Sequence, residues 1–315
     1  MQKPNTVINI PILQRYDIIE LDFNQDNFMK GADMSEVRWE KLKPREIEKR
    51  INELPVVYVP FGSLEWHGYH NPLGLDTIKA RALCLRSAEK YGGVVTPATY
   101  WPIGGMPHPW TVRMSEEMIH NLAVAIFQQM AYVGFKVVIA LTGHYGIEQV
   151  YHIKKSALEV MYQTGLSIYA LPEYEVTADE GYRGDHAAKW ETSLTQYLFP
   201  DLVDMNEAEP ADKPMDGVGG DDPRIHASKE LGEKFAELTI DRLGLVANRL
   251  AKETSARDRS RFISACDVHC QMLQRFSWGC LGNESYWQGV TALWKGNYDE
   301  ASGAFYELGR SVKGS

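Results

Sequence analysis

Short apolar runs alternate along this chain with longer segments of helical periodicity, and this alternation restricts the possible folds more than any other feature. The runs rich in β-branched residues are 56–62, 94–101, 136–143 and 166–173. The segments with helical spacing are 76–92, 115–134 and 146–165, and each ends at a glycine. Near-continuous apolar strands are typical of a sheet that is covered on both faces. The pattern therefore predicts βαβ units and an α/β fold with a mostly parallel sheet.

The composition argues against several classes of partner. Of the 315 residues, 44% are hydrophobic and 24% are charged, as in ordinary globular proteins, and the net charge is −9. An acidic chain suits neither nucleic acid nor an anionic membrane, so we expect neither as a partner. No apolar run approaches the roughly 20 residues that span a bilayer, and the N-terminus lacks the apolar core of a signal peptide. Four cysteines are too few for a disulfide scaffold, so we expect a cytoplasmic protein with free thiols.

The last part of the chain departs from this alternation. Residues 200–224 are rich in Pro, Gly, Asp and Glu, which predicts a long surface loop such as a lid or an oligomer contact. Residues 286–310 predict a helical hairpin whose spacing resembles one tetratricopeptide unit, although a solenoid needs about three. We therefore expect one domain over 1–255 and a helical extension over 256–315 that packs on it.

Side chains that bind metals or transfer protons follow three of the predicted strands. They are Glu65, His67, His70 and Asp76 after the first strand, His144 after the third, and Asp185, His186 and Glu191 after the fourth. The carboxyl ends of parallel strands lie at one edge of the sheet, where ligands bind. Mixed oxygen and nitrogen ligands suit Zn²⁺ or Mn²⁺. Each residue alone is more often a cap or a structural histidine, so the prediction of a metal site depends on their joint position.

Three motifs in this order resemble those of the creatininase (creatinine amidohydrolase) family. The stretch "GSLEWHGYHNPLGLD" resembles the family signature G-S-x-E-Q-H-G-x-H-L-P-L-x-T-D. The stretch "TGHYG" is similar to its N-G-H-x-G-N element, and "GDHAAKWETS" to its D-H-A-G-x-x-E-T-S element. The resemblance covers residues 36–200 and does not extend to 256–315.

The resemblance implies a three-layer α/β/α domain with two divalent metal ions per chain, Zn²⁺ or Mn²⁺. Glu65 and His144 would hold one ion, His67 and Glu191 the other, and Asp76 would bridge both. A metal-bridging hydroxide would attack a ring amide carbonyl. The resemblance also implies a homo-oligomer, such as a hexamer.

His186 would be the acid–base group that protonates the leaving nitrogen. His186 and Glu191 are five residues apart, about 140° around a helix, so both could not face one metal pair from mid-helix. We therefore expect His186 in the loop before a helix and Glu191 in the first turns of that helix. His70 and Asp185 are expected to support the ligands from behind.

Departures from the family pattern fall mainly around the substrate. The family's Gln after the first Glu is Trp66 here, the residue before His70 is Tyr69, and the acidic residue that follows H-Y in creatininase is Gly146. All five implied ligands remain, so metal binding is expected, but creatinine itself becomes a doubtful substrate. The candidate substrate-binding residues are Tyr145, Tyr182 and His108.

The leading hypothesis is a metal-dependent hydrolase (amidohydrolase) of a small cyclic amide or related C–N bond. One alternative keeps the metals and the fold but makes the enzyme a deformylase or a cyclic keto-sugar hydrolase. Another alternative, motivated by the helical extension, is a non-catalytic binding or scaffold protein that recruits a peptide.

Overall fold

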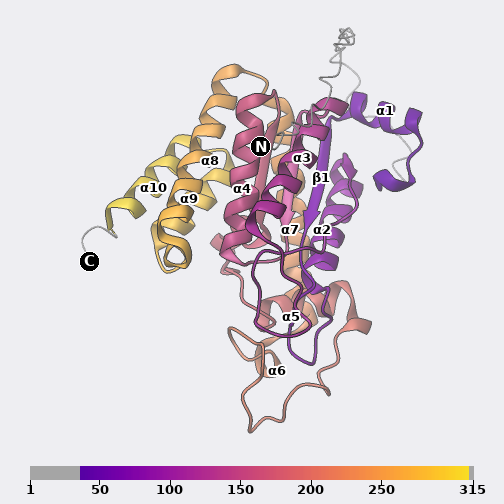
Figure 1. Ribbon diagram of the computed structural model, residues 1–315, viewed down its shortest axis with the longest axis vertical. Helices are drawn as coiled ribbons and strands as arrows, with labels where there is room; N and C mark the ends of the chain where they lie inside the picture. The colour runs from indigo at the N-terminus through magenta and orange to yellow at the C-terminus, as the bar shows by residue number, and fades with distance from the viewer. Residues whose placement is uncertain (1–35, 312–315) are drawn as a thin grey trace, which may run out of the picture. The chain divides into compact units, whose positions relative to one another are not determined.

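The structure, a computed structural model, describes residues 36–311 (Figure 1). The expectation that the N-terminus lacks a signal peptide concerns residues outside this range. The strands are β1 (Val56–Phe61), β2 (Val94–Val95), β3 (Val137–Thr142) and β4 (Ser167–Pro172). The helices are α1 (Pro44–Glu53), α2 (Leu75–Tyr91), α3 (Glu116–Val133), α4 (Ile147–Gln163), α5 (Lys189–Leu198), α6 (Pro223–His226), α7 (Lys229–Lys252), α8 (Ala256–Phe276), α9 (Glu284–Lys295) and α10 (Tyr298–Ser311). Short 3-10 turns include η1 (Trp39–Lys41), η2 (Glu173–Val176), η3 (Ala178–Glu180), η4 (Pro200–Leu202) and η5 (Ser277–Cys280).

The four strands form one parallel sheet in the order β2-β1-β3-β4, which confirms the predicted fold class. Every residue of β1, β3 and β4 is buried, as their near-continuous apolar sequences predict. Phe61 pairs with Thr142, and Thr142 pairs with Pro172. These three strands therefore end at the same level, and the residues that follow them start from one edge of the sheet.

The second strand is shorter than the predicted 94–101. Only Val94 and Val95 form a regular ladder with β1, and Pro97, two residues after Val95, has no N–H to donate. The chain nevertheless continues beside β1, because the Thr96 and Thr99 N–H groups donate to backbone oxygens of β1 at 3.0 and 3.2 Å. The edge strand thus loses its regular pairing but keeps its course along the sheet.

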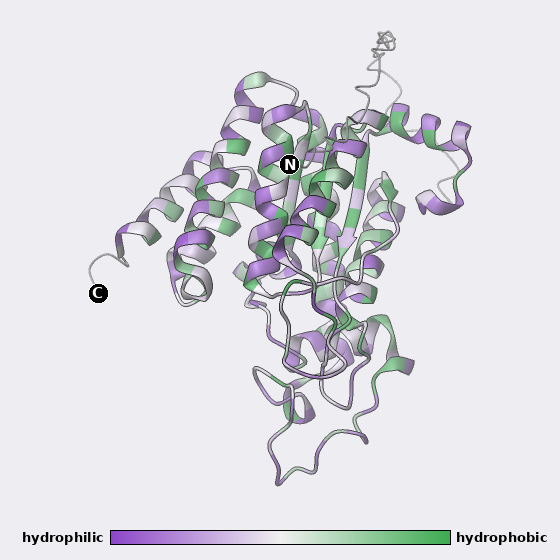
Figure 2. Ribbon diagram, viewed as in Figure 1, coloured by the Kyte–Doolittle hydropathy of each residue, from purple (hydrophilic) through white to green (hydrophobic). Residues whose placement is uncertain are grey.

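Helices cover both faces of the sheet. The connection from β1 to β2 runs in one direction across the sheet, whereas those from β2 to β3 and from β3 to β4 run in the other. Right-handed crossovers then place α2 on one face and α3 with α4 on the opposite face. In agreement, α2 packs against α7, and α3 packs against α4 (Figure 1). Figure 2 shows apolar residues along the strands and polar residues on the outward faces of these helices.

The C-terminal helices α8, α9 and α10 are present, as predicted. α10 packs against both α8 and α9, α8 packs against α4, and α9 packs against η2 (Figure 1). The division of the chain into functional parts at residue 255 stays a prediction. Among the described helices, none is both long and apolar enough to cross a membrane.

Candidate metal centre

Five of the predicted ligand side chains meet at the carboxyl edge of the sheet and form two overlapping groups. One group comprises Glu65, Asp76 and His144, and the other comprises His67, Asp76 and Glu191. Within each group the potential ligand atoms all lie within 4.8 Å of one another. All five side chains are buried. Asp76 belongs to both groups, so its carboxylate lies between them.

The two carboxylate oxygens of Asp76 face different histidines. Oδ1 lies 3.2 Å from His67 Nε2, and Oδ2 lies 3.1 Å from His144 Nδ1. The outer carboxylates complete the groups, because Glu65 Oε2 is 2.7 Å from His144 Nδ1 and Glu191 Oε2 is 3.6 Å from His67 Nε2. Oxygen and nitrogen donors arranged in this way suit two divalent cations that share one carboxylate.

The fold brings these residues together from four places in the sequence. Glu65 and His67 lie in the loop after β1, and His144 lies two residues after β3. Asp76 and Glu191 lie in the first turns of α2 and α5. β1 and β3 are neighbours whose following helices cover opposite faces of the sheet, and ligands of open parallel sheets bind at such a switch point. The site therefore occupies the position that this architecture favours.

A glycine allows β3 and α2 to approach each other closely at the site. A Cβ atom on Gly143 would lie only 2.1 Å from the backbone oxygen of Asp76. Any side chain at this position would push α2 away from the end of β3, and Asp76 would move with the helix. Gly143 thus permits the contact between Asp76 and His144.

Backbone carbonyls orient both histidines of the groups. His67 Nδ1 lies 3.0 Å from Glu65 O, and His144 Nε2 lies 3.1 Å from Ile103 O. A carbonyl oxygen only accepts hydrogen bonds, so these two ring nitrogens donate. In a neutral imidazole, the lone pair is then on the nitrogen that faces the carboxylates. Histidines that bind metals are commonly held in this way.

Charge interactions shift the pKa values of the buried groups. Burial lowers the pKa of His67, but the Asp76 carboxylate outweighs this effect and raises the pKa to about 9. Burial also lowers the pKa of His144, but the Glu65 carboxylate outweighs this effect and holds the pKa well above its usual range. Burial raises the pKa of Asp76, but His67 and His144 hold it well below the ordinary carboxyl value. Protons on the histidines and divalent cations therefore compete for the same carboxylates.

The buried charges around the two groups do not balance. Lys79 Nζ lies 2.8 Å from an oxygen of Glu191 and 2.8 Å from an oxygen of Glu173. Four buried carboxylates, those of Glu65, Asp76, Glu173 and Glu191, outnumber this ammonium group and the protons on His67 and His144. The net charge is −1 with both imidazoles protonated and would be −3 with both neutral, as metal binding requires. Among the described residues, Glu65 Oε2 has no polar partner besides His144 Nδ1. Unpaired buried charge is costly, so the donor set fits divalent cations.

His186 lies beside the two groups that share Asp76 and is more exposed than the side chains that form them. With Glu65 and His67 it makes a third set of possible metal ligands. It is 23% exposed, lies in the loop before α5, and its ring centroid is 4.4 Å from that of His67. Nε2 donates to Trp66 O at 2.9 Å, whereas Nδ1 lies 3.9 Å from Glu65 Oε1. Burial and the charge of His67 lower the pKa of His186. Two backbone hydrogen bonds of 2.8 Å to Gly219, in the predicted 200–224 loop, fix this position.

His70 and Asp185 lie behind the groups and contact the start of α5. His70 Nε2 donates to Ala187 O at 3.0 Å. Asp185 accepts hydrogen bonds from the backbone N–H groups of Trp190 and Glu191, at 2.7 and 3.1 Å. Burial and the charge of Glu191 raise the pKa of Asp185 to about 7. Both residues thus fix the helical turn that carries Glu191, although a supporting role in metal binding stays a prediction.

The two predicted substrate-contacting tyrosines belong to a buried hydrogen-bond network. Tyr182 is fully buried, and its hydroxyl contacts that of Tyr145. Tyr145 donates to Glu173 at 2.6 Å and accepts from Lys79 at 2.9 Å. Both hydroxyls are therefore engaged by protein groups, and their contact with a substrate stays a prediction.

His108, the third predicted substrate-contacting residue, belongs to an aromatic wall at the ligand loop. Its ring stacks on Trp66 with centroids 4.1 Å apart, and Trp66 also contacts Tyr69 and Trp110. Tyr69 and Trp110 are 55% and 56% exposed. Because Trp66 lies between Glu65 and His67 in the sequence, this wall (Trp66, Tyr69, His108 and Trp110) begins at the metal centre.

Sequence reasoning missed two charged residues of the site, Lys79 and Glu173. Both are completely buried. Lys79 contacts Glu191 directly, and Glu173 contacts Lys79. A signal existed, because Lys79 lies three residues after Asp76 and so shares a face of α2 with it. Glu173 directly follows β4, at the same sheet edge as the other polar residues.

Comparisons with known proteins agree with the motifs. A family model described as creatininase, creatinine amidohydrolase, matches residues 40–246. The chain is 25% identical to the creatinine amidohydrolase of Pseudomonas putida over 248 residues, which cover 67% of this chain and 94% of the relative. It is 27% identical to the 3-dehydro-scyllo-inosose hydrolase of Thermotoga maritima over 180 residues, which cover 53% of this chain and 58% of that protein.

Solved structures show the same fold. A crystal structure of creatinine amidohydrolase superposes with a TM-score of 0.57 at 24% identity and covers 70% of this chain and 98% of its own. A manganese form of creatininase gives a TM-score of 0.54 at 26% identity, with 69% and 98% covered. Other creatininase structures include a Zn–Zn type. The oligomeric state and the cellular location of this chain stay predictions. The predicted family is confirmed: the chain belongs to the creatininase family, and it is a hydrolase.

Proposed function

We propose that the protein is a divalent-metal-dependent hydrolase of a small cyclic amide or related C–N bond. The observation that carries the proposal is the pair of ligand groups that share Asp76, with His186 beside them. Glu65, Asp76 and His144 would hold one ion, and His67, Asp76 and Glu191 the other. Two divalent ions in such a site would activate water and polarise a carbonyl group.

His186 would transfer the proton that the reaction needs. Because Nε2 donates to Trp66 O, Nδ1 is the nitrogen free to accept a proton and to pass it to the leaving nitrogen. The backbone hydrogen bonds to Gly219 and the packing on His67 hold the ring in place. The buried carboxylates would bind and orient the metal ions, whereas His186, which is 23% exposed and lies 3.9 Å from Glu65, would be left to transfer the proton.

The aromatic wall supports a ring-shaped substrate. Tyr69 and Trp110 expose more than half of their surfaces beside the ligand loop, and rings pack well on such faces. The wall would hold one face of the substrate while the reacting bond lies over the metal centre.

A second candidate substrate is a cyclic keto-sugar. The inosose hydrolase relative matches at an identity similar to that of creatinine amidohydrolase, and the exposed rings of the wall would pack on either substrate. A third candidate activity, that of a deformylase, is tested with formamides in the same substrate panel. The scaffold hypothesis loses its support, because the chain is a hydrolase that retains all five ligand-type residues.

A substrate panel tests this proposal. Purified protein with added Zn²⁺ or Mn²⁺ would be assayed on cyclic amides, cyclic keto-sugars and formamides, with and without a chelator. We expect hydrolysis of at least one cyclic amide, abolished by the chelator and restored by the metal. Chelator-sensitive turnover of keto-sugars or formamides alone would favour the corresponding alternative. Turnover that a chelator leaves unchanged would contradict the metal mechanism.

A further inference from the structure

Lys79 is a completely buried lysine in the second turn of α2, three residues after Asp76. Its Nζ donates to Glu191 Oε1 at 2.8 Å and to Tyr145 OH at 2.9 Å, and it lies 2.8 Å from Glu173 Oε1. An ammonium group has three protons, so these three partners satisfy it fully. The side chain is therefore fixed by its contacts.

Lys79 determines which oxygen of Glu191 faces the metal centre. Oε1 is occupied by the ammonium group, and Oε2 faces His67 Nε2 at 3.6 Å. The Ala187 N–H donates to the same Oε2 at 2.8 Å, so this bond and the Lys79 bond to Oε1 together define the rotation of the carboxylate. Without Lys79, nothing among the described contacts of Oε1 would prevent the carboxylate from turning.

Tyr145 and Glu173 hold Lys79 in turn. Tyr145 donates to Glu173 Oε1 at 2.6 Å, so these two residues and the ammonium group close a triangle of hydrogen bonds. Tyr182 supports the triangle through its contact with the Tyr145 hydroxyl. Hydrogen bonds and ion pairs thus connect a network of five residues, namely Lys79, Tyr145, Glu173, Tyr182 and Glu191. Of these, only Glu191 belongs to a ligand group.

We propose that Lys79 is a positioning residue that presents Glu191 to the second metal ion through Oε2 alone. This inference rests on the proposed function, because it concerns the same metal centre. It assigns the Lys79–Glu173–Tyr145 triangle to the half of the centre formed by His67, Asp76 and Glu191. The other half, with Glu65 and His144, has no contact with Lys79.

A simpler role for Lys79 would be to neutralise Glu173. The double variant K79M/E173Q separates the two roles, because it removes both charges of the pair together. If Lys79 only neutralises Glu173, the double variant should bind metal as the wild type does. If it positions Glu191, the half of the centre that contains Glu191 should weaken alone.

Calorimetric titration of the metal-depleted full-length protein with Zn²⁺ measures both halves. For the wild type we expect two binding steps. For K79M/E173Q we expect one step close to the wild type and one step weakened about 10–100-fold, the usual effect of removing a group that orients a ligand. The variant E191Q should weaken the same step.

A matched control is K154M/E175Q, which removes a second buried lysine–glutamate pair and leaves the metal groups untouched. Both binding steps should remain unchanged in it. If K79M/E173Q does not fold, K79Q in the E173Q background serves in its place, since it also removes both charges, shortens the side chain so that the contact with Glu191 is lost, and should weaken the second step at least tenfold.

The outcomes separate this inference from the proposed function. Two unchanged steps in K79M/E173Q, or in K79Q/E173Q, would overturn the positioning role and leave the metal centre intact. A wild-type protein without any binding step would contradict the metal centre itself.

Discussion

Two buried lysine–glutamate pairs meet at η2, the turn that follows β4, and they differ in what surrounds them. Glu173 pairs with Lys79 of α2, and Glu175 pairs with Lys154 of α4, both with N–O distances of 2.8 Å. Both glutamates are completely buried. The two pairs therefore have the same chemistry at nearly the same place in the sequence.

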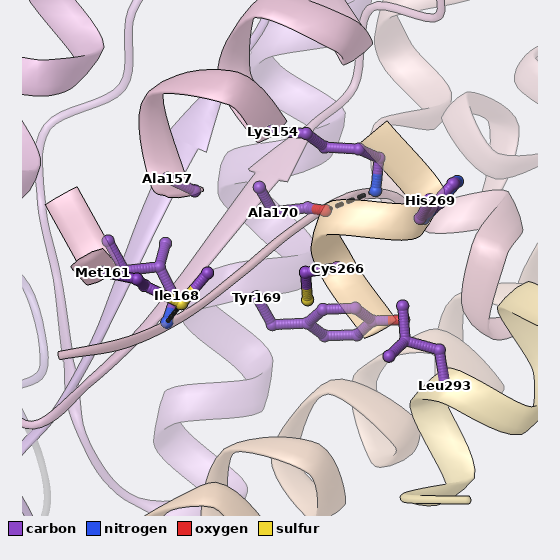
Figure 3. Close-up of a pocket in the computed structure, with 9 residues that line it drawn as sticks. All are labelled: Lys154, Ala157, Met161, Ile168, Tyr169, Ala170, Cys266, His269 and Leu293. Carbon is purple, nitrogen blue, oxygen red and sulfur yellow. Dashed lines mark hydrogen bonds between the residues drawn. The ribbon is translucent and has the colours of Figure 1, made fainter. Parts of the chain in front are cut away.

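The second pair is balanced within the protein. Lys154 also donates to Ala170 O at 2.6 Å, and Tyr286 of α9 donates to Glu175 at 3.2 Å (Figure 3 shows Lys154, Ala170 and His269). His269 of α8 lies 3.7 Å from Glu175, and burial holds its pKa well below the usual value, so it is neutral. One positive and one negative charge remain, and a cavity of about 10 Å³ beside them has room for a single water molecule.

The first pair adjoins an excess of negative charge that Lys79 does not balance and that protons on His67 and His144 only reduce. Lys79 serves both Glu173 and Glu191, and the Glu65 and Asp76 carboxylates lie beyond them. A balanced buried pair joins elements of the fold, here the C-terminal helices to the sheet. An unbalanced cluster requires a cation from outside. This contrast predicts opposite responses to matched substitutions.

The histidines of the two regions should respond most differently. His186→Asn removes the proposed acid–base group, and we expect kcat to fall about 10²–10⁴-fold with unchanged metal content. His269→Asn removes a buried ring stacked on Phe305 and should lower the free energy of unfolding by about 1–3 kcal/mol, with kcat per folded molecule unchanged. Steady-state kinetics and denaturant unfolding check both. Equal kcat values for the two variants would contradict the distinction.

Lys154→Met should destabilise the protein without affecting the metal. The substitution leaves Glu175 as an uncompensated buried charge, which costs about 3–5 kcal/mol. Denaturant unfolding gives this free energy, and metal analysis of the folded protein should match the wild type. Loss of one metal ion in this variant would show that the two regions are not independent.

The same variant predicts a pH dependence of known sign. Burial raises the pKa of Glu175, and Lys154 partly lowers it, so the variant should raise it further. The folded state then binds this proton more tightly than the unfolded chain, and acid favours folding. The stability loss relative to the wild type should therefore be smaller at about pH 5.5 than at about pH 8. A loss that grows on acidification would refute this explanation.

The smallest contrast concerns two tyrosine hydroxyls. Tyr286→Phe removes a donor to Glu175, and Tyr145→Phe removes a donor to Glu173; each should cost about 1.5 kcal/mol of unfolding free energy. Only Tyr145→Phe should also weaken metal binding, because Tyr145 contacts Lys79. Zinc titration of both variants makes this comparison, and a weaker site in Tyr286→Phe would count against it.

Periodicity was enough to predict the sheet and its helices, because strand burial and glycine stops are local signals. The predicted segment 136–143 differs from β3 by one residue at each end. The predicted second strand was too long because Pro97 interrupts the hydrogen-bond ladder although the chain stays extended. An apolar pattern does not distinguish an extended chain with a regular ladder from one without it.

The ligand-type residues of the site were visible because they follow strand ends, where parallel sheets bind ligands. Lys79 was missed, although it shares a helix face with Asp76, because a lysine in an amphipathic helix usually faces solvent. Its burial depends on Glu173, which is almost a hundred residues away in the sequence. The pair of Lys154 and Glu175, with Tyr286, was hidden for the same reason. Partners that are distant in the sequence leave no periodic signal.

The central claim is that Asp76 lies between two metal ions. Metal analysis of the wild type and of Asp76→Ala, both supplied with Zn²⁺ or Mn²⁺ and then freed of excess, tests it directly. We expect about two ions per wild-type chain and none in the variant, because Asp76 belongs to both of the proposed ligand groups. A metal-free wild type, or an Asp76→Ala variant that retains both ions, would contradict it.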